Sequence, residues 1–450
     1  MAAGIPLTGH GDHAAIFAYR QGRPVTVAQF IGAARQLAAR LPEKKYVLNV
    51  CTDRYLFALG FAAALLRGQV SLFPPNHTPD LVAQLKADYP GLYCLSDAGH
   101  QFPGVETLIF PELGELARRD EQVPIVPAGQ CAALVFTSGS TGRPVAHAKS
   151  WGGLSRDGAA EAVALGLADK TGYAVLGTVP PQHMYGLEST VLLPMQGGQA
   201  LVAERPFYAA DILAQLNALP EPRCLVTTPV HLRILLAEAE PMPAVAFILS
   251  ATAPLAEELA KEAEARFGAP LHEIYGCTEA GQVACRQTAR SSAWRPLEGI
   301  GLRQDAEART WVSGGHVETE VLLSDVIELG EDGTFLLHGR ASDMVNIAGK
   351  RTSLGSLNHH LNAIAGVRDG VFVLPEEADD ELGRPMAFVV APGIPGATIL
   401  KALRERIDPV FLPRPLYFVD ALPRNATGKL TREAVRQMRH AHAVEGEGDA

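Results

Sequence analysis

Between residues 46 and 135, short apolar runs alternate with segments in which apolar residues recur at helical spacing. The runs at 46–50, 70–73 and 92–95 have the pattern of strands, and the segments 54–67 and 80–87 between them have the pattern of helices. Such alternation is typical of a mainly parallel sheet covered by helices. We therefore expect an α/β fold, in which ligands bind beyond the carboxyl ends of the strands.

The same rhythm continues downstream and then changes. Strands are expected at 173–179, 200–202, 224–228, 245–250 and 271–276, and helices at 189–195, 209–219 and 256–267. Short runs at 311–312, 317–323 and 334–338 indicate a more antiparallel region. With 450 residues the chain is too long for one core, so two or three units are expected.

Charge and composition exclude several classes of protein. A formal net charge of -10 argues against nucleic acid as the main partner. The apolar stretch 46–66 is interrupted by Asp53 and Arg54, so no membrane span is expected. The start lacks the pattern of a signal peptide, and the six cysteines contain no C-x-x-C pair. We expect a cytoplasmic protein with reduced thiols.

The segment Phe136–Pro144 follows the apolar run 131–135 and has four hydroxyl side chains and two glycines before a proline. Glycine lets the backbone approach a ligand, and free N–H groups with Ser/Thr hydroxyls form a cradle for anions. The segment is not a Walker A loop and lacks the Rossmann glycine spacing. Taken alone, it leaves a polyphosphate cradle and a plain surface loop equally open.

Four later segments complete an ordered set. Tyr275–Glu279 places an aromatic ring, a hydroxyl and a carboxylate on one turn after a strand. It is followed by Ser324-Asp325, by the turn 339–343 with Gly349–Arg351, and by 422–432 around Gly428-Lys429. With the loop and the segment 180–188, this set resembles the adenylate-forming superfamily of acyl-CoA synthetases, luciferases and adenylation domains. The resemblance covers about residues 130 to 432.

The resemblance implies an enzyme, an AMP-forming carboxylate–thiol ligase. A carboxylate attacks the α-phosphate of ATP to give an acyl-adenylate and pyrophosphate, and a thiol of coenzyme A or of a carrier phosphopantetheine then takes the acyl group. Polyphosphate binding is implied for Thr137, Ser138, Gly139, Ser140, Thr141 and Gly142. Tyr275 with Gly276 is implied at adenine, Thr278 at the α-phosphate, Asp325 with Arg340 at the ribose, and Glu279 with Thr141 at Mg²⁺. Lys429 is implied to bridge the reacting carboxylate and α-phosphate.

The resemblance also implies two domains. An N-terminal domain, 1–340, with parallel helix-covered sheets and a β-subdomain, binds ATP and the acid. A small α+β C-terminal domain, 341–450, rotates on a hinge at 341–343, and the tail from about 440 to 450 is expected to be disordered. After rotation, Gly349, Lys350 and Arg351 would lie beside the thiol; a solvated basic pair is the equally open alternative.

Two departures bear on chemistry and substrate. Pro144-Val145-Ala146 stands where the superfamily usually has Pro-Lys-Gly, and Lys149 or Arg143 are candidates to compensate. The segment His183–Glu188 lacks the aspartate with which amino-acid-activating members hold the α-amine, although Glu188 leaves that choice open. We expect a simple aryl or medium-chain acid, in a pocket formed by His183, Tyr185, Gly186, Thr227, Ser250, Ala251 and Gly281.

The wording of 180–188 and the short chain look most like compact superfamily members of aryl-polyene pigment synthesis. Two alternatives to a coenzyme A ligase stay open: an enzyme that loads an acyl carrier protein, and a nucleotide-binding homologue without turnover. The expected state is a monomer or a homodimer.

Overall fold

The computed structural model describes residues 4–113, 122–138, 144–340, 344–347, 350–374, 385–424, 430 and 432–446. A first sheet of six strands has the order β10-β9-β5-β4-β6-β7. All its neighbours pair in parallel except the β9–β10 hairpin. The helix α2 packs on this sheet and α1 packs on α2. Their bounds are α1 (Val27–Ala38), β4 (Tyr46–Asn49), α2 (Arg54–Leu66), β5 (Val70–Phe73), α3 (Pro79–Asp88), β6 (Tyr93–Ser96), β7 (Glu106–Ile109), β9 (Cys131–Ser138) and β10 (Pro144–Ser150).

A second sheet of nine strands has the order β17-β16-β15-β14-β13-β11-β12-β2-β3. It is parallel from β15 to β2 and antiparallel at both edges. Its strands are β2 (Ile16–Arg20), β3 (Arg23–Thr26), β11 (Ala174–Gly177), β12 (Ala200–Val202), β13 (Arg223–Thr227), β14 (Ile248–Ser250), β15 (Leu271–Cys277), β16 (Gly281–Arg286) and β17 (Arg295–Pro296).

Alternate residues of the second sheet supply two different cores, because successive side chains of a strand point to opposite faces. Leu176 and Leu225 pack with one set of helices, and Val175 and Val226 pack with the other. The first set is α7 (Ala209–Ala218), α8 (Pro229–Leu236) and α9 (Glu257–Phe267); the second includes α4 (Trp151–Ala164), α5 (Met184–Leu187) and α6 (Leu193–Gly197). Both faces are therefore covered, and ligands have access only at the strand ends.

One buried arginine joins the two sheets at these ends. Arg54, at the start of α2, donates hydrogen bonds to the carbonyls of Gly177, the last residue of β11, and Val179, two residues further on, at 2.9 Å each. It also donates to the carbonyls of Val202 and Glu204 beside β12, at 2.9 and 3.0 Å. The four carbonyls compensate for burying the guanidinium group.

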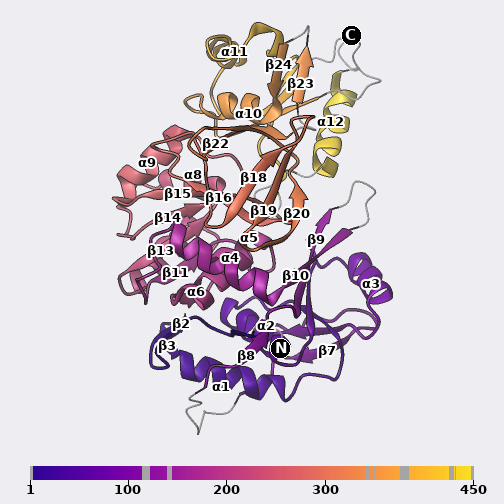
Figure 1. Cartoon of the computed structure of the whole chain (residues 1–450). Coiled ribbons are helices and arrows are strands. Elements are labelled where there is room, and N and C mark those ends of the chain that lie inside the picture. The colour runs from indigo at the N-terminus through magenta and orange to yellow at the C-terminus, as the bar shows by residue number, and fades with distance from the viewer. Residues whose placement is uncertain are drawn as a thin grey trace.

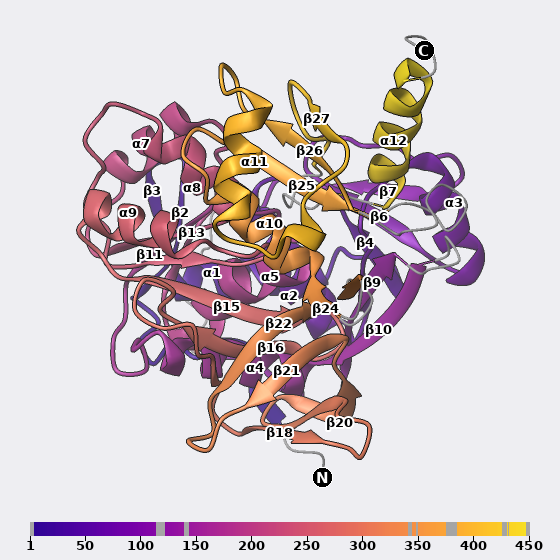
Figure 2. The ribbon, with the colours of Figure 1, turned by 90° about the horizontal axis from the view of Figure 1, so that it is seen from above.

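The remaining chain forms smaller antiparallel sheets. These contain β18 (Ile300–Gln304), β19 (Thr310–Gly314), β20 (Val317–Leu322), β21 (Asp325–Leu329) and β22 (Phe335–Arg340), and a short pair, β1 (Gly4–Pro6) with β8 (Ile125–Pro127), lies apart from them. The C-terminal region has its own core, in which Leu357, Phe372 and Ile399 are buried, and Figures 1 and 2 show it above the N-terminal sheets. Its elements are β23 (Met344–Ile347), β24 (Lys350–Ser353), α10 (Leu354–Asn362), β25 (Asp369–Val373), β26 (Met386–Val390), α11 (Gly396–Arg404), a 3₁₀ turn (Pro409–Phe411), β27 (Leu416–Phe418) and α12 (Arg432–Gly446).

The predicted α/β class, with parallel sheets, an antiparallel region and a separate C-terminal domain, is confirmed. The boundary at residue 340 stays a prediction. The expected helix 189–195 is broken into a π-helical turn, Glu188–Leu192, and the helix α6. Pro194 lacks the N–H that would continue a regular α-helix here. The helix α12 extends over residues 440–446, where disorder was expected, because alanine and long side chains favour helix. Of the helices described, none combines the length and hydropathy needed to cross a bilayer.

Candidate active site

The β9–β10 hairpin carries the predicted phosphate loop. Residues Gly139 to Arg143, at its tip, lie outside the described residues, as does the side chain of Ser138. On the described part of β10, Val145, His147 and Lys149 share one face, because they are two residues apart. Nε2 of His147 lies 3.0 Å from Oγ1 of Thr137, which holds the two strands together at the base of the loop.

The same face of β10 contacts the turn that joins β15 to β16. Lys149 donates from Nζ to the carbonyl of Glu279 at 2.7 Å, and Nε2 of His147 is 3.7 Å from Oε1 of Glu279. Burial lowers the pKa of His147, partly offset by the Glu279 carboxylate. The hairpin and the Thr278–Glu279 turn are thus held as one unit.

Two glycines make this turn tight. A Cβ on Gly276 would lie 2.4 Å from the carbonyl oxygen of Gly281, and Gly281 itself has a φ of +85°. Thr278 and Glu279 are therefore presented at the tip of the turn. The side chain of Glu279 is 41% exposed, so its oxygens suit a hard cation such as Mg²⁺. No cluster of three metal-ligating side chains occurs in the described parts of the chain. Thr141, the other residue predicted at Mg²⁺, lies outside the described residues.

Tyr275 and Asp325 are brought together from strands 50 residues apart. The Tyr275 hydroxyl donates to Oδ2 of Asp325 at 2.8 Å. The ring of Tyr275 packs against Trp294 and Phe335, with centroids 5.7 and 5.9 Å away. Asp325 pairs with Arg340 in the β21–β22 ladder, of which only the Arg340 backbone is described. The residues predicted at the adenine and the ribose are therefore neighbours.

The predicted acid pocket is formed by residues with unequal roles. His183 precedes the first turn of α5 and is half-buried. Gly186 has no room for a side chain, because a Cβ would lie 1.9 Å from the Pro180 carbonyl oxygen. The Tyr185 hydroxyl donates to the carbonyls of Thr227 and Leu249, at 3.1 Å each, so this ring is fixed within the sheet. Ser250, Ala251 and Thr227 are buried at the ends of β13 and β14.

Beside Gly281 lies a closed group of carboxyls, here called the acid cluster: Asp157 and Glu161 on α4, and Glu188 on the π-helical turn. Their exposed fractions are 2%, 0% and 4%. A Cβ on Gly281 would lie 2.8 Å from Oδ2 of Asp157 and 3.1 Å from Oε1 of Glu188. Two buried polar side chains adjoin the cluster: Nε2 of His316 is 3.5 Å from Oδ1 of Asp157, and Gln282 donates to Oγ of Ser189 at 3.2 Å.

Burial sets the protonation of this cluster. It raises the pKa of Glu161 to about 8, an effect that Ser189 partly offsets. Burial also raises the pKa of Asp157, and it raises that of Glu188 far above its usual range, with Asp157 adding to the effect. Burial lowers the pKa of Lys149, and the carboxyl of Glu188 acts in the opposite direction. Burial thus favours the uncharged form of all three carboxyls, and Lys149 is the basic side chain that acts on them.

The structure describes only some of the residues that are predicted to lie beside the thiol. Lys350 pairs with Asp408, whereas Gly349, the Arg351 side chain and Lys429 lie outside the described residues. The sequence reasoning missed His147, Asp157 and Glu161. A signal for the last two existed, since acids at positions i and i+4 of α4 lie on the face that also carries the buried Leu154 and Gly158.

Comparison with known proteins agrees with this geometry. Residues 36–312 match the family model described as AMP-binding enzyme, and residues 365–429 match AMP-binding enzyme C-terminal domain. The 4-coumarate–CoA ligase of Rhodobacter capsulatus is 29% identical over 72% of this chain and 83% of its own length. The 2-succinylbenzoate–CoA ligase of Bacillus velezensis is 24% identical over 93% of this chain and 94% of its own.

The fold is shared with solved structures. o-Succinylbenzoate CoA synthetase (MenE) of Bacillus subtilis, with its acyl-adenylate intermediate, superposes with a TM-score of 0.80. The match covers 96% of this chain and 98% of that one, at 19% identity.

Proposed function

Because this chain belongs to the family of AMP-binding enzymes, we propose that it activates an aryl or medium-chain carboxylic acid with ATP and transfers the acyl group to coenzyme A. The predicted membership of the adenylate-forming superfamily is confirmed, and so is the class of enzyme, an AMP-forming carboxylate–thiol ligase. The aryl or medium-chain substrate and the choice of acceptor are our proposal.

One observation supports the proposal above the others. Lys149 joins the β9–β10 hairpin to the Thr278–Glu279 turn by a hydrogen bond, and the strand β15 that enters this turn carries Tyr275, whose hydroxyl donates to Asp325. A nucleoside triphosphate bound across these three parts would have its base and ribose at Tyr275 and Asp325, and its phosphates at Thr278 and the hairpin. Positioned donors of this kind act where charge accumulates during displacement at the α-phosphate.

The roles follow from these positions. Thr137 and His147 would support the loop that holds the β- and γ-phosphates. Mg²⁺ on Glu279 would neutralise charge on the phosphate oxygens. His183 would border the acid's carboxylate, and Lys429, carried by a rotating C-terminal domain, would bridge that carboxylate and the α-phosphate. The thiol then displaces AMP from the acyl carbon.

The names of the relatives support the choice of substrate class. They are ligases of 4-coumarate, 2-succinylbenzoate and indoleacetate, which are all aromatic acids. The small residues Thr227, Ser250 and Ala251 are buried at the ends of β13 and β14, and they suit a pocket for a flat ring.

Thioester formation tests the proposal. The protein, ATP, Mg²⁺ and coenzyme A are mixed with benzoic, cinnamic, fatty and amino acids, and AMP and acyl-CoA are measured. We expect acyl-CoA from an aryl acid without a carrier protein. AMP release that requires a phosphopantetheinylated carrier would favour the carrier-loading alternative, and no acid-dependent AMP would contradict catalysis.

A further inference from the structure

A cavity of about 410 Å³ lies where the two large sheets meet. Its walls come from loops that follow β4, β5 and β6 of the first sheet, and β11 and β12 of the second. In each case the chain leaves the carboxyl end of a parallel strand, which is the place where ligands bind in open α/β sheets. The volume falls within the range of small-molecule sites.

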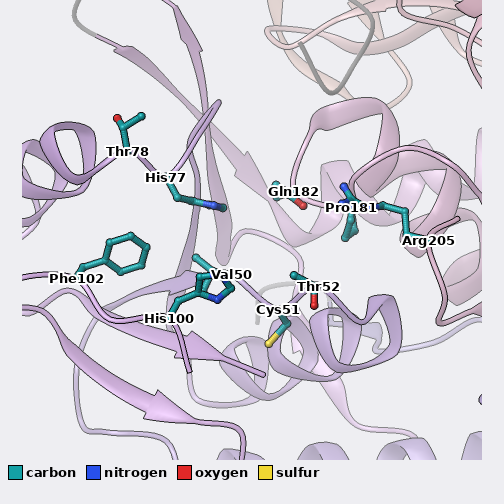
Figure 3. Close-up of a pocket in the computed structure, with 10 residues that line it drawn as sticks. All are labelled: Val50, Cys51, Thr52, His77, Thr78, His100, Phe102, Pro181, Gln182 and Arg205. Carbon is teal, nitrogen blue, oxygen red and sulfur yellow. The ribbon is translucent and has the colours of Figure 1, made fainter. Parts of the chain in front are cut away.

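The walls of this cavity contain several hydrogen-bond donors and one arginine. Figure 3 shows Thr52, His77 and His100 on the side of the first sheet, facing Gln182 and Arg205 from the second. Among the described residues that line it, none carries a carboxylate. Asp97 lies nearby, but its Oδ2 accepts hydrogen bonds from the backbone N–H groups of Thr52 and Asp53, at 2.8 Å each.

His77 has a ring nitrogen that could bind a ligand. Nε2 of His77 is buried and makes no hydrogen bond to any part of the chain that the structure describes. Burial, with a smaller contribution from the neighbouring His100, lowers the pKa of His77 to about 4. An anion in the cavity would offset both causes, since it would accept from Nε2 and neutralise the repulsion between the two rings.

The cavity adjoins the candidate active site. Pro181 and Gln182 line it, and the next residue is His183, which we place at the reacting carboxylate. Arg54 fixes this arrangement, because it binds the carbonyl of Val179 and that of Glu204, which precedes Arg205. A reactant that extends past His183 would therefore reach Arg205 and the two histidines of the cavity.

We propose that this cavity is a subsite for an anionic group, a phosphate or a second carboxylate, carried by one of the two reactants that meet at His183, with His77, His100 and Arg205 as its ligands. The inference rests on the proposed function and deepens it. A phosphate would belong to the thiol acceptor, and a carboxylate would belong to a dicarboxylic acid substrate. In both cases Phe102 offers an apolar wall beside the anion.

The test uses pairs of reactants that differ only in the anion, with the full chain and its His77→Gln and Arg205→Gln variants. One arm measures the KM for coenzyme A and for dephospho-coenzyme A in thioester formation. The other measures the KM for an aryl monoacid and for the same acid with a second carboxylate in pyrophosphate exchange. Arg23→Gln, which removes an exposed arginine from the edge strand β3, is the matched control.

In one arm, each cavity variant is expected to raise the KM of the anion-bearing member by ~10-fold or more, the loss typical of a charge-assisted hydrogen bond. The anion-free member should change by less than twofold, and Arg205→Lys should lose less than Arg205→Gln. The arm in which the effect occurs identifies the source of the anion. Equal changes for both members of each pair, or no change in both arms, would overturn the subsite.

A different result would show that the proposed function is wrong while the subsite can still be tested. If the wild-type protein forms neither ATP nor thioester in these assays, calorimetry with the same pairs decides the subsite. Preferential binding of one anion-bearing member, lost in His77→Gln with an unchanged melting temperature, supports it. Equal binding of both members, or none, contradicts it.

Discussion

The segment 180–188 separates two polar regions of opposite character. At one end, Pro181 and Gln182 border a cavity of about 410 Å³ lined by histidines and an arginine. At the other end, Glu188 is 4% exposed and belongs to the closed acid cluster. The cationic region has space for a ligand, whereas a Cβ on Gly281 would already overlap the acid cluster.

The difference indicates that the cavity can bind a ligand, whereas the acid cluster holds neighbouring residues in place. Arg205 gives the open cavity a positive charge, which attracts anionic reactants. Burial favours the protonated form of the closed carboxyls, so they act through packing rather than through charge. Lys149 lies between the acid cluster and the Glu279 carbonyl, and therefore transmits the cluster's position to the turn that faces the nucleotide.

The largest effect is expected from filling the space beside the acid cluster. Gly281→Ala forces a Cβ to within 2.8 Å of Oδ2 of Asp157, at a φ of +85°. Strain and overlap together should lower the free energy of unfolding by about 2–5 kcal/mol and reduce pyrophosphate exchange by roughly 100-fold. Chemical denaturation and the exchange rate measure both.

Gly268→Ala is the matched control for Gly281→Ala. Its φ is +63°, and a Cβ there meets no atom within 4 Å. It should cost only the backbone term, about 1–2 kcal/mol, with exchange retained. Equal losses in the two variants would show that the acid cluster is not closely packed.

Protonation of the cluster predicts a dependence of stability on pH. The pKa of Glu161 is raised to about 8 in the folded protein, so its contribution is fully present below its ordinary value, near 4.5, and is lost as the pH rises through 8. Glu161→Gln cannot ionise and should flatten the fall in the free energy of unfolding between pH 5 and 8.5 by a few kcal/mol. Urea titrations at several pH values measure this change.

Glu262→Gln, on the exposed face of α9, is the control for that series. It should leave the slope with pH unaltered. Parallel curves for Glu161→Gln and the wild type would mean that the cluster is charged at neutral pH, and the distinction between the two regions would fail.

A smaller effect is expected from removing the hydrogen bond between Lys149 and the Thr278–Glu279 turn. Lys149→Met removes the hydrogen bond to the Glu279 carbonyl. The KM for Mg-ATP should rise about tenfold while the KM for the acid stays within twofold, because the turn faces the phosphates. Lys149→Arg should restore part of the loss, and Lys170→Met, at an exposed site, should have no effect. A rise in both KM values would indicate general damage.

The smallest effect concerns the departure after the phosphate loop. Val145 is 50% exposed on the face of β10 that carries His147 and Lys149. Val145→Lys places an ammonium nearer the loop and should lower the KM for ATP about two- to threefold, as exposed charges are weak. Ala148→Lys, on the opposite face, should change nothing. Equal gains would show only a general charge effect.

Much of the fold was predictable because its signals are local. The strand 70–73 was placed at its observed bounds, and the parallel rhythm follows from neighbouring segments. The strand β2 was missed, since its place depends on pairing Ala18 with Leu201, far away in the chain. The irregular turn at Glu188 was also missed, because packing against α4 determines it.

The candidate site likewise contains residues that the sequence predicts and residues that only the fold brings together. Ordered motifs named Tyr275, Glu279 and Asp325 before their contacts were known. The acid cluster and the cavity are formed by residues that belong to no motif. Asp157 meets Gly281, and His77 faces Gln182, only after the two sheets have assembled.

The central claim is that the hairpin, the turn and the Tyr275–Asp325 pair form an adenylation site. Acid-dependent exchange of labelled pyrophosphate into ATP tests it most directly, across benzoic, cinnamic, fatty and amino acids. The account predicts exchange with an aryl acid or a medium-chain fatty acid, strongly reduced in Gly281→Ala and weakened in Lys149→Met. Absence of exchange with every acid, while ATP still binds, would contradict it.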